Sequence, residues 1–139
     1  MSQENVEIVR RGMDAFSRAA WEESVELMAP DVEWHDAPDL PGARLYQGRE
    51  GVLARWKDMA EALDDFAVEI EQLFDAGDHV VVFFTSRGRG RISGIEVSRK
   101  LAQVTTVREG RVVKIVGYDK RAEALEAVGL SEQDAHADS

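Results

Sequence analysis

Residues 66–119 read FAVEIEQLFDAGDHVVVFFTSRGRGRISGIEVSRKLAQVTTVREGRVVKIVGYD, and this stretch decides the fold. Apolar and polar side chains alternate from Phe66 to Glu71, which is the period of a β-strand. Three glycine-containing pairs interrupt the apolar runs and are typical of tight turns: Gly77-Asp78, Ser93-Gly94 and Glu109-Gly110. The stretch therefore predicts four consecutive strands joined by short turns, an antiparallel meander.

Upstream of the meander the apolar residues recur with the period of a helix. This spacing predicts one helix around residues 6–16 and another from Gly48 to Leu63. Between them a shorter helix is expected over residues 21–28, and it ends before Pro30 because the residue before a proline avoids the helical region.

Two short strands are expected at residues 32–36 and 44–47, and a last short helix at residues 121–128. We expect an α+β domain over residues 1–130, in which a curved antiparallel sheet wraps over the three N-terminal-side helices. The result is a cone-shaped α+β barrel with one pocket. Residues 131–139 have little apolar surface to bury, so we expect a disordered polar tail.

The composition narrows the possible partners and cofactors. With 27 acidic against 17 basic residues the net charge is -10, which disfavours nucleic acids and anionic membranes. The absence of cysteine excludes disulfides, thiolate nucleophiles and cysteine-based zinc sites. Histidines and carboxylates do not show metal-ligand spacing either, so we expect no metal and no cofactor. Neither a signal peptide nor a membrane span is visible, which predicts a cytoplasmic protein.

If each turn has two central residues, the sheet register follows from the sequence. One face then collects the apolar side chains that pack on the helices, and Ala102 and Gly117 lie side by side there and leave space for a ligand. The ligand-binding residues are predicted to be Trp34, Trp56, Phe83, Thr85, Lys100, Ile115 and Gly117. The two tryptophans are alternatively plain core residues, the interpretation that the helical apolar stripe favours for Trp56.

The same register places Arg87, Lys100 and Asp119 in a row across three strands at the rim of this face. Beside two cations Asp119 stays a carboxylate and can orient a water or a substrate, with Arg87 as its clamp. The alternative is a structural row of ion pairs. A β-bulge in any of these strands would shift the row.

The opposite face of the sheet is apolar as well. It is predicted to carry Val82, Phe84, Leu101, Gln103, Thr105, Val116 and Tyr118. Such a surface is too apolar for free exposure on a soluble monomer. We therefore expect a homodimer through the outer face of the sheet.

Four stretches, 30–36, 46–52, 108–113 and 118–130, resemble the superfamily of SnoaL-like polyketide cyclases and ketosteroid isomerases. In that superfamily they correspond to the first strand, the entry into the third helix, the last hairpin and the C-terminal helix. The resemblance implies a nuclear transport factor 2-like fold with a conical cavity. It is specific for the fold and weak for the reaction, because one fold hosts many functions.

The resemblance also implies proton transfer by cavity carboxylates on apolar carbonyl compounds or epoxides. Asp36 matches the position of the ketosteroid isomerase base, and Asp119 lies near the carboxylate of SnoaL-type cyclases. The first helix has no tyrosine and the second oxyanion-hole position falls near Ala102, so steroid isomerase chemistry is not expected. Arg87 and Asp119 supply part of the Asp-Arg-Asp set of epoxide-hydrolase relatives. The candidate catalytic residues are thus Asp36, Asp119 and Arg87.

Asp36 follows His35 on the same strand, so only one of these two side chains enters the cavity. The alternative role for Asp36 is to cap the proline loop.

Two classes of function stay open. One is the binding of a small apolar oxygenated molecule, with cofactor-free isomerisation, cyclisation or hydration. The other is a non-catalytic ligand-binding or accessory dimer. An enzyme needs a buried cavity carboxylate with an empty space beside it, whereas a binding protein needs an apolar cavity whose charges are paired.

Overall fold

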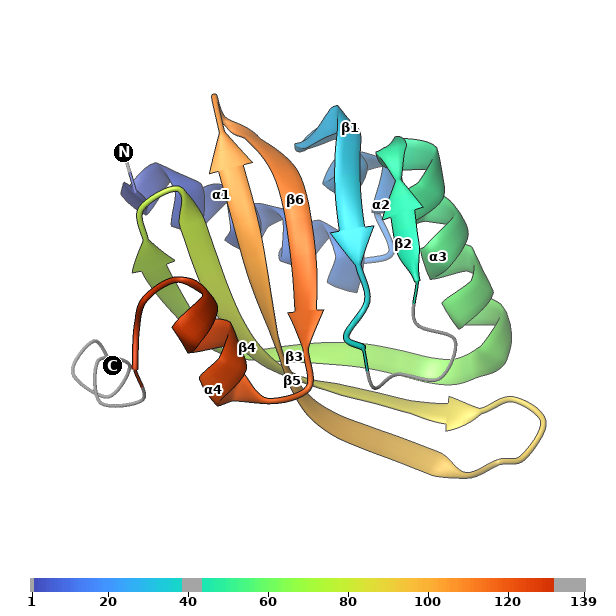
Figure 1. The fold of residues 1–139 in the computed structure, drawn as a ribbon. Coiled ribbons are helices and arrows are strands. Elements are labelled where there is room, and N and C mark those ends of the chain that lie inside the picture. Colours follow the sequence, from blue (N-terminus) through green and yellow to red (C-terminus); the bar gives the residue numbers. More distant parts are fainter. Residues whose placement is uncertain (1, 39–43, 132–139) are drawn as a thin grey trace.

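A computed structural model describes residues 2–38 and 44–131 of the chain and has an α+β fold (Figure 1). Its elements are α1 (Ser2–Ser17), α2 (Trp21–Glu26), β1 (Met28–His35), β2 (Leu45–Gln47), α3 (Gly48–Ala62), β3 (Leu63–Ala76), β4 (His79–Gly90), β5 (Glu96–Arg108), β6 (Arg111–Tyr118) and α4 (Arg121–Ala127). The predicted fold class is therefore confirmed. The predicted tail lies outside the described residues from position 132 onward.

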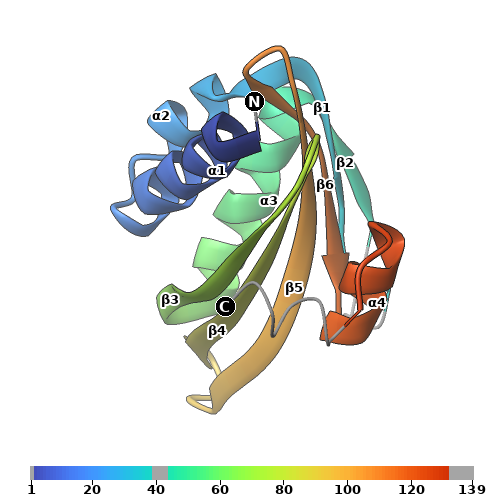
Figure 2. The same cartoon turned by 90° about the vertical axis from the view of Figure 1, so that its left-hand side faces the viewer.

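The six strands form one curved, unclosed sheet in the order β2-β1-β6-β5-β4-β3. Strands β1 and β6 pair in parallel, and the other neighbours are antiparallel. Helices α1, α2 and α3 cover one face of the sheet, called the inner face below, whereas α4 lies on the outer face (Figure 2). The sheet thus wraps over the three N-terminal-side helices, as predicted.

The second helix is shorter than predicted. It ends at Glu26, and Met28 already belongs to β1, so that Pro30 lies inside this strand. Pro30 falls where the pairing of β1 with β6 is irregular, between Met28 and Glu33. The missing N–H of proline therefore leaves no gap in a regular ladder.

Two of the three meander turns have two central residues, as predicted: the pairs Ala76–His79 and Arg108–Arg111 close them. In the last turn Glu109 and Gly110 both have positive φ, 51° and 77°. Positive φ at both central positions is typical of the type I′ turn, whose twist matches that of paired strands.

The middle turn is longer than predicted. Strand β4 ends at Gly90 and β5 begins at Glu96, and Arg87 pairs with Ser98 instead of Lys100. Lys100 pairs with Thr85. The predicted row of Arg87, Lys100 and Asp119 is therefore wrong, because Arg87 and Lys100 are not opposite each other.

A β-bulge in β6 has a larger effect on the sheet. Val107 pairs with Val112, but Thr106 pairs with Lys114, so Val113 has no partner on β5. The extra residue reverses the faces of β5, and through it of β4, relative to β6, because strand side chains alternate with a period of two.

The predicted faces of β4 and β5 are consequently exchanged. Phe84 and Leu101, expected in a dimer interface, pack in the inner core instead. Phe83 and Ala102 lie on the outer face, under Leu125 of α4. The outer face that was predicted as a dimer interface thus consists largely of other residues than expected, and α4 packs on part of it.

Candidate functional site

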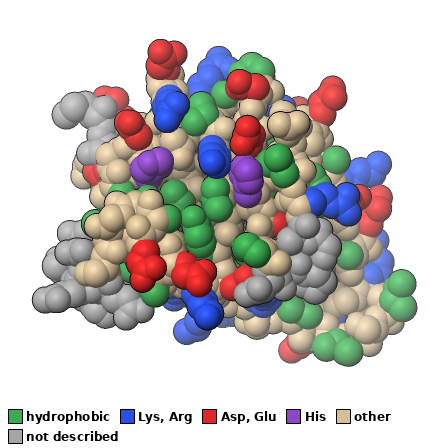
Figure 3. All heavy atoms as spheres, in the orientation of Figure 1, with side chains coloured by type: hydrophobic (Ala, Val, Ile, Leu, Met, Phe, Trp, Pro, Cys, Tyr) green, Lys and Arg blue, Asp and Glu red, His purple; other side chains and the backbone are tan. Residues whose placement is uncertain are grey.

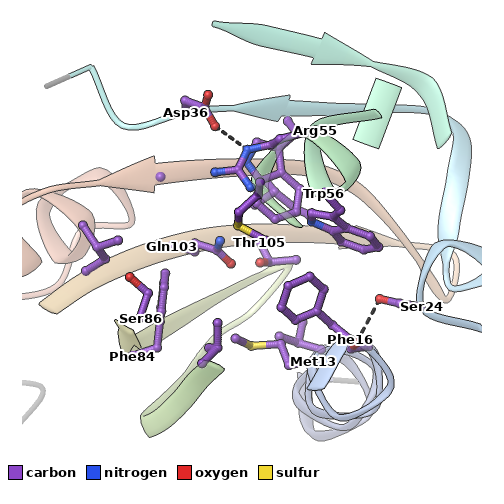
Figure 4. Close-up of a pocket in the computed structure, with 18 of the residues that line it drawn as sticks. Met13, Phe16, Ser24, Asp36, Arg55, Trp56, Phe84, Ser86, Gln103 and Thr105 are labelled. Atoms are coloured by element: carbon purple, nitrogen blue, oxygen red, sulfur yellow. Dashed lines mark hydrogen bonds and ion pairs between the residues drawn. The ribbon is translucent and has the colours of Figure 1, made fainter. Parts of the chain in front are cut away.

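A cavity of about 320 Å³ lies between the inner face of the sheet and helices α1 and α3 (Figure 4). Its walls are mostly apolar side chains, among them Ile8, Met13, Phe16, Trp34, Trp56, Met59, Phe66, Val68, Phe84, Leu101 and Ile115. The volume is at the lower end for small-molecule sites. It holds on the order of ten non-hydrogen atoms if each takes about the volume of a water molecule.

An ion pair stands in this apolar wall. Nε of Arg55, on α3, donates to Oδ1 of Asp36 at 2.6 Å, and the other carboxylate oxygen accepts from the backbone N–H of Arg44 at 3.4 Å. The side chains of Asp36 and Arg55 are only 8% and 20% exposed. The guanidinium lies 4.7 Å from the centre of the Trp34 ring. Asp36 therefore reaches the cavity, whereas Nε2 of His35 contacts Glu33 at 3.0 Å.

Several polar groups of the cavity wall make no hydrogen bond with another described residue. They are the two Nη groups of Arg55, the amide of Gln103 and the hydroxyls of Ser86 and Thr105. Figure 4 shows Arg55, Gln103 and Thr105 extending toward the same space from α3 and β5. Because these groups line the cavity, they can bond to a ligand or to water there.

A second ion pair reaches the same cavity through Arg99. Nη2 of Arg99 donates to Oδ1 of Asp119 at 2.6 Å, and the side chains are 32% and 14% exposed. Arg99 lines the cavity, whereas Asp119 does not. The predicted partners of Asp119 are wrong: Arg87 pairs with Glu69 at the surface, and Lys100 is exposed on the outer face. The longer middle turn and the bulge in β6 account for the change.

Gly117 lines the cavity but does not open it. A Cβ added there would lie 3.0 Å from the backbone nitrogen of Ala37. The glycine is thus needed because the chain after β1 crosses β6 at close range.

Phe83 and Thr85 belong to a cluster on the outer face, away from the cavity. The Thr85 hydroxyl donates to Glu71, and Nη1 of Arg121 donates to the same carboxylate at 3.0 Å. Nη2 of Arg121 also donates to the Phe84 carbonyl at 3.2 Å, and the guanidinium lies 4.8 Å from the Phe83 ring. This cluster fastens the start of α4 to the sheet.

The cluster predicts a pH-dependent stability. The hydrogen bonds from Arg121 and, next, from Thr85 lower the pKa of Glu71 from 4.5 to about 2, against an opposing effect of burial. Because the folded pKa is the lower one, the stabilisation is present above pH 4.5 and is lost as the pH falls toward 2. We expect Glu71→Gln to cost about 1 kcal/mol at pH 7, since solvent screens part of the interaction. Urea unfolding from pH 7 to pH 3 should show the two proteins converging; a constant difference would contradict this origin.

The structure brings half of the predicted site residues together. Trp34, Asp36, Trp56, Ile115 and Gly117 line the cavity. Both tryptophans also belong to the hydrophobic core, so they serve as core and as cavity wall. Phe83, Thr85, Arg87, Lys100 and Asp119 do not line it.

Sequence reasoning missed Arg55 and Arg99. Arg55 nevertheless carries a signal, because Val52, Arg55, Trp56 and Met59 stand at the i, i+3, i+4 and i+7 positions of one helix face. A cation in an apolar stripe indicates an inward-facing charge. Arg99 offers no such signal, since its direction depends on the bulge in β6.

Within residues 2–38 and 44–131 no three His, Asp or Glu side chains are grouped as metal ligands. In the same part of the chain no helix is long and apolar enough to cross a membrane.

The protein-family model described as the SnoaL-like domain matches residues 9–115 of the chain. The chain belongs to the SnoaL-like domain family. No curated protein matches its sequence. Solved structures share the fold of this SnoaL-like protein at low sequence identity.

One is an NTF2-like protein from Burkholderia thailandensis E264, with a TM-score of 0.78 and 23% identity over 84% of this chain and 90% of the other. TerC, co-crystallised with polyporic acid, has a TM-score of 0.75 and 20% identity over 90% and 98%. A protein with a ketosteroid isomerase-like fold from Catenulispora acidiphila DSM 44928, in complex with trimethylamine, has a TM-score of 0.72 and 20% identity over 91% and 95%.

Proposed function

We propose that this SnoaL-like protein binds a small, largely apolar molecule that carries oxygen. The observation that supports it is the cavity itself: an apolar space of about 320 Å³ with a few convergent polar groups that have no partner among the described residues. Small-molecule sites are built in this way, with apolar walls for affinity and few polar groups for orientation. The structural similarity to TerC, which was co-crystallised with polyporic acid, is in keeping with it.

The charges of the cavity favour binding over catalysis. Asp36 is the carboxylate that reaches the cavity, and Arg55 and the backbone of Arg44 already occupy its oxygens. Each of these oxygens keeps a second acceptor site, but a proton taken up by Asp36 would leave the poorly exposed Arg55 cation without its counter-charge. We therefore rank the non-catalytic ligand-binding protein first.

Cofactor-free isomerisation, cyclisation or hydration is the second candidate. It is supported by the position of Asp36 at the cavity wall, with only 8% of its side chain exposed. In that proposal Asp36 is the base. Asp119 holds Arg99 in place by their hydrogen bond, and Arg99 takes the role of orienting substrate or water that was predicted for Arg87.

A ligand that co-purifies with the protein tests the proposal. Native mass spectrometry of protein purified gently from its source should show a non-covalent small-molecule adduct. Ser86 lines the cavity, so Ser86→Phe should fill the space and abolish the adduct. Ser98→Phe adds the same ring at an exposed position of β5 and is the matched control. An adduct that survives equally in both variants would place the ligand elsewhere.

The homodimer and the cytoplasmic location stay part of this proposal. Phe84 and Leu101 no longer support a dimer, but Val116 and Tyr118 are partly exposed on the outer face. Figure 3 shows hydrophobic side chains near the middle of that face, with charged and histidine side chains around them. Sedimentation at micromolar concentration and cell fractionation address these two points.

A further inference from the structure

We propose that Asp36 makes the cavity selective for neutral ligands. The Arg55–Asp36 pair offers hydrogen-bond donors without a net charge. The cavity therefore accepts an apolar molecule with one acceptor oxygen, of the ketone, quinone or ester class, and rejects the carboxylate of the same shape. This inference rests on the proposed function, because it names the chemistry of the ligand in the same cavity.

The donors come from the free edge of the guanidinium. Asp36 takes only the Nε side of Arg55, and both Nη groups are left without a partner among the described residues. Trp34 lies against the guanidinium plane at 4.7 Å, which helps to hold its orientation. An arginine has donors and no acceptor, so this edge requires an acceptor atom on the ligand.

The other polar groups of the wall do not impose the same demand. The hydroxyls of Ser86 and Thr105 and the amide of Gln103 can each donate or accept. They tolerate a second polar atom of either kind. Arg55 is therefore the group of the wall that specifically requires a hydrogen-bond acceptor on the ligand.

The charge balance decides which acceptor fits. Arg55 is already neutralised by a carboxylate whose side chain is 8% exposed and thus poorly solvated. The neighbouring pair of Arg99 with Asp119 is balanced in the same way. A ligand carboxylate would add a negative charge that no cation of these two pairs offsets, in surroundings where uncompensated charges are costly. A neutral carbonyl oxygen takes the same hydrogen bonds without that cost.

Three compounds of nearly the same shape test the selectivity: acetophenone, benzoate and α-methylstyrene. They present a neutral oxygen, a charged carboxylate and no oxygen at the same place. Their dissociation constants can be measured at pH 7.5 by ¹H–¹⁵N NMR titration, with the indole N–H signals of Trp34 and Trp56 as reporters of the cavity. We expect acetophenone to bind about tenfold more tightly than either of the others, the scale of one hydrogen bond to a charged donor.

Asp36→Asn removes the internal counter-ion at nearly constant shape. Benzoate should then bind at least about tenfold more tightly than in the wild type, because Arg55 is left with an unbalanced charge. Asp65→Asn removes the same charge from a surface pair with Arg89 and should leave the ranking of the three compounds unchanged. Benzoate as tight as acetophenone in the wild type, or an unchanged ranking in Asp36→Asn, would overturn the inference.

Arg55→Gln provides a second test that does not depend on the folding of Asp36→Asn. It should bring acetophenone and α-methylstyrene to within about twofold of each other, because the charged donor is gone. A persisting tenfold advantage would mean that another group recognises the oxygen. If none of the three compounds moves the tryptophan signals of the wild type, the proposed function itself fails, and this inference with it.

Discussion

Replacing Trp56 with alanine should lower the free energy of unfolding by about 3–5 kcal/mol, the range for deleting a large buried aromatic side chain. Trp56 is 3% exposed and lies where α3 meets both α1 and the sheet. Its ring centre is 4.9 Å from that of Phe16 and 6.0 Å from those of Trp21 and Trp34. The substitution therefore removes dispersion contacts with three rings and leaves a hole beside an existing cavity.

The hole cannot readily close, because the cavity on the other side of Trp56 offers no atoms to move inward. Urea unfolding followed by circular dichroism should show the loss as a lower midpoint at a similar slope. Trp56→Phe keeps an aromatic ring and should recover at least half of the lost stability. A loss below about 1 kcal/mol in Trp56→Ala would show that this ring belongs to the ligand site and contributes little to the core.

The fold class was predictable because its signals are local. The helical period up to Leu63, the strand period from Phe66 and the glycine turns at 77–78 and 109–110 specify helices, strands and two hairpins within short windows. Such signals depend on side chains close together in sequence, and these remain valid whatever the rest of the chain does.

The inner and outer faces were not predictable in the same way. The bulge at Val113 adds a residue that has no distinguishing feature in the sequence. The side chains of the strands paired beyond the bulge then point to the opposite face of the sheet. Thr105 and Gln103 illustrate the result: their polarity is compatible with an outer face, yet both line the cavity. To predict which side chains line the cavity, one must know where the bulge in β6 lies, and the alternation of apolar and polar side chains does not show this.

The candidate site was only half predictable. Asp36 came from the family resemblance, and its position at the end of β1 holds. Its partner Arg55 lies 19 residues further along the chain, on a different element. The ion pair exists only because α3 packs against β1, which is a property of the assembled fold.

Replacing Arg55 with leucine should cost about 3 kcal/mol, because it leaves the buried carboxylate of Asp36 without its cation. The bond that is lost is short, 2.6 Å, and Asp36 keeps only the long contact to the Arg44 N–H. Asp36→Leu alone should also lower the free energy of unfolding, because it leaves the Arg55 guanidinium without its anion. Arg55 is more exposed than Asp36, however, and can turn toward water. Chemical denaturation of each single variant gives these two values.

The double variant Asp36→Leu/Arg55→Leu separates stability from function. Replacing a buried ion pair by apolar side chains of similar volume is often neutral or stabilising, so we expect the double variant to unfold within about 1 kcal/mol of the wild type. A double-mutant cycle would then give a coupling energy of several kcal/mol between the two residues. If the cost of the double variant were the sum of the two single costs, the pair would not act as a unit. A stable double variant that has lost its preference for a ketone over a hydrocarbon would mean that the pair is maintained for the ligand, since the fold does not require it.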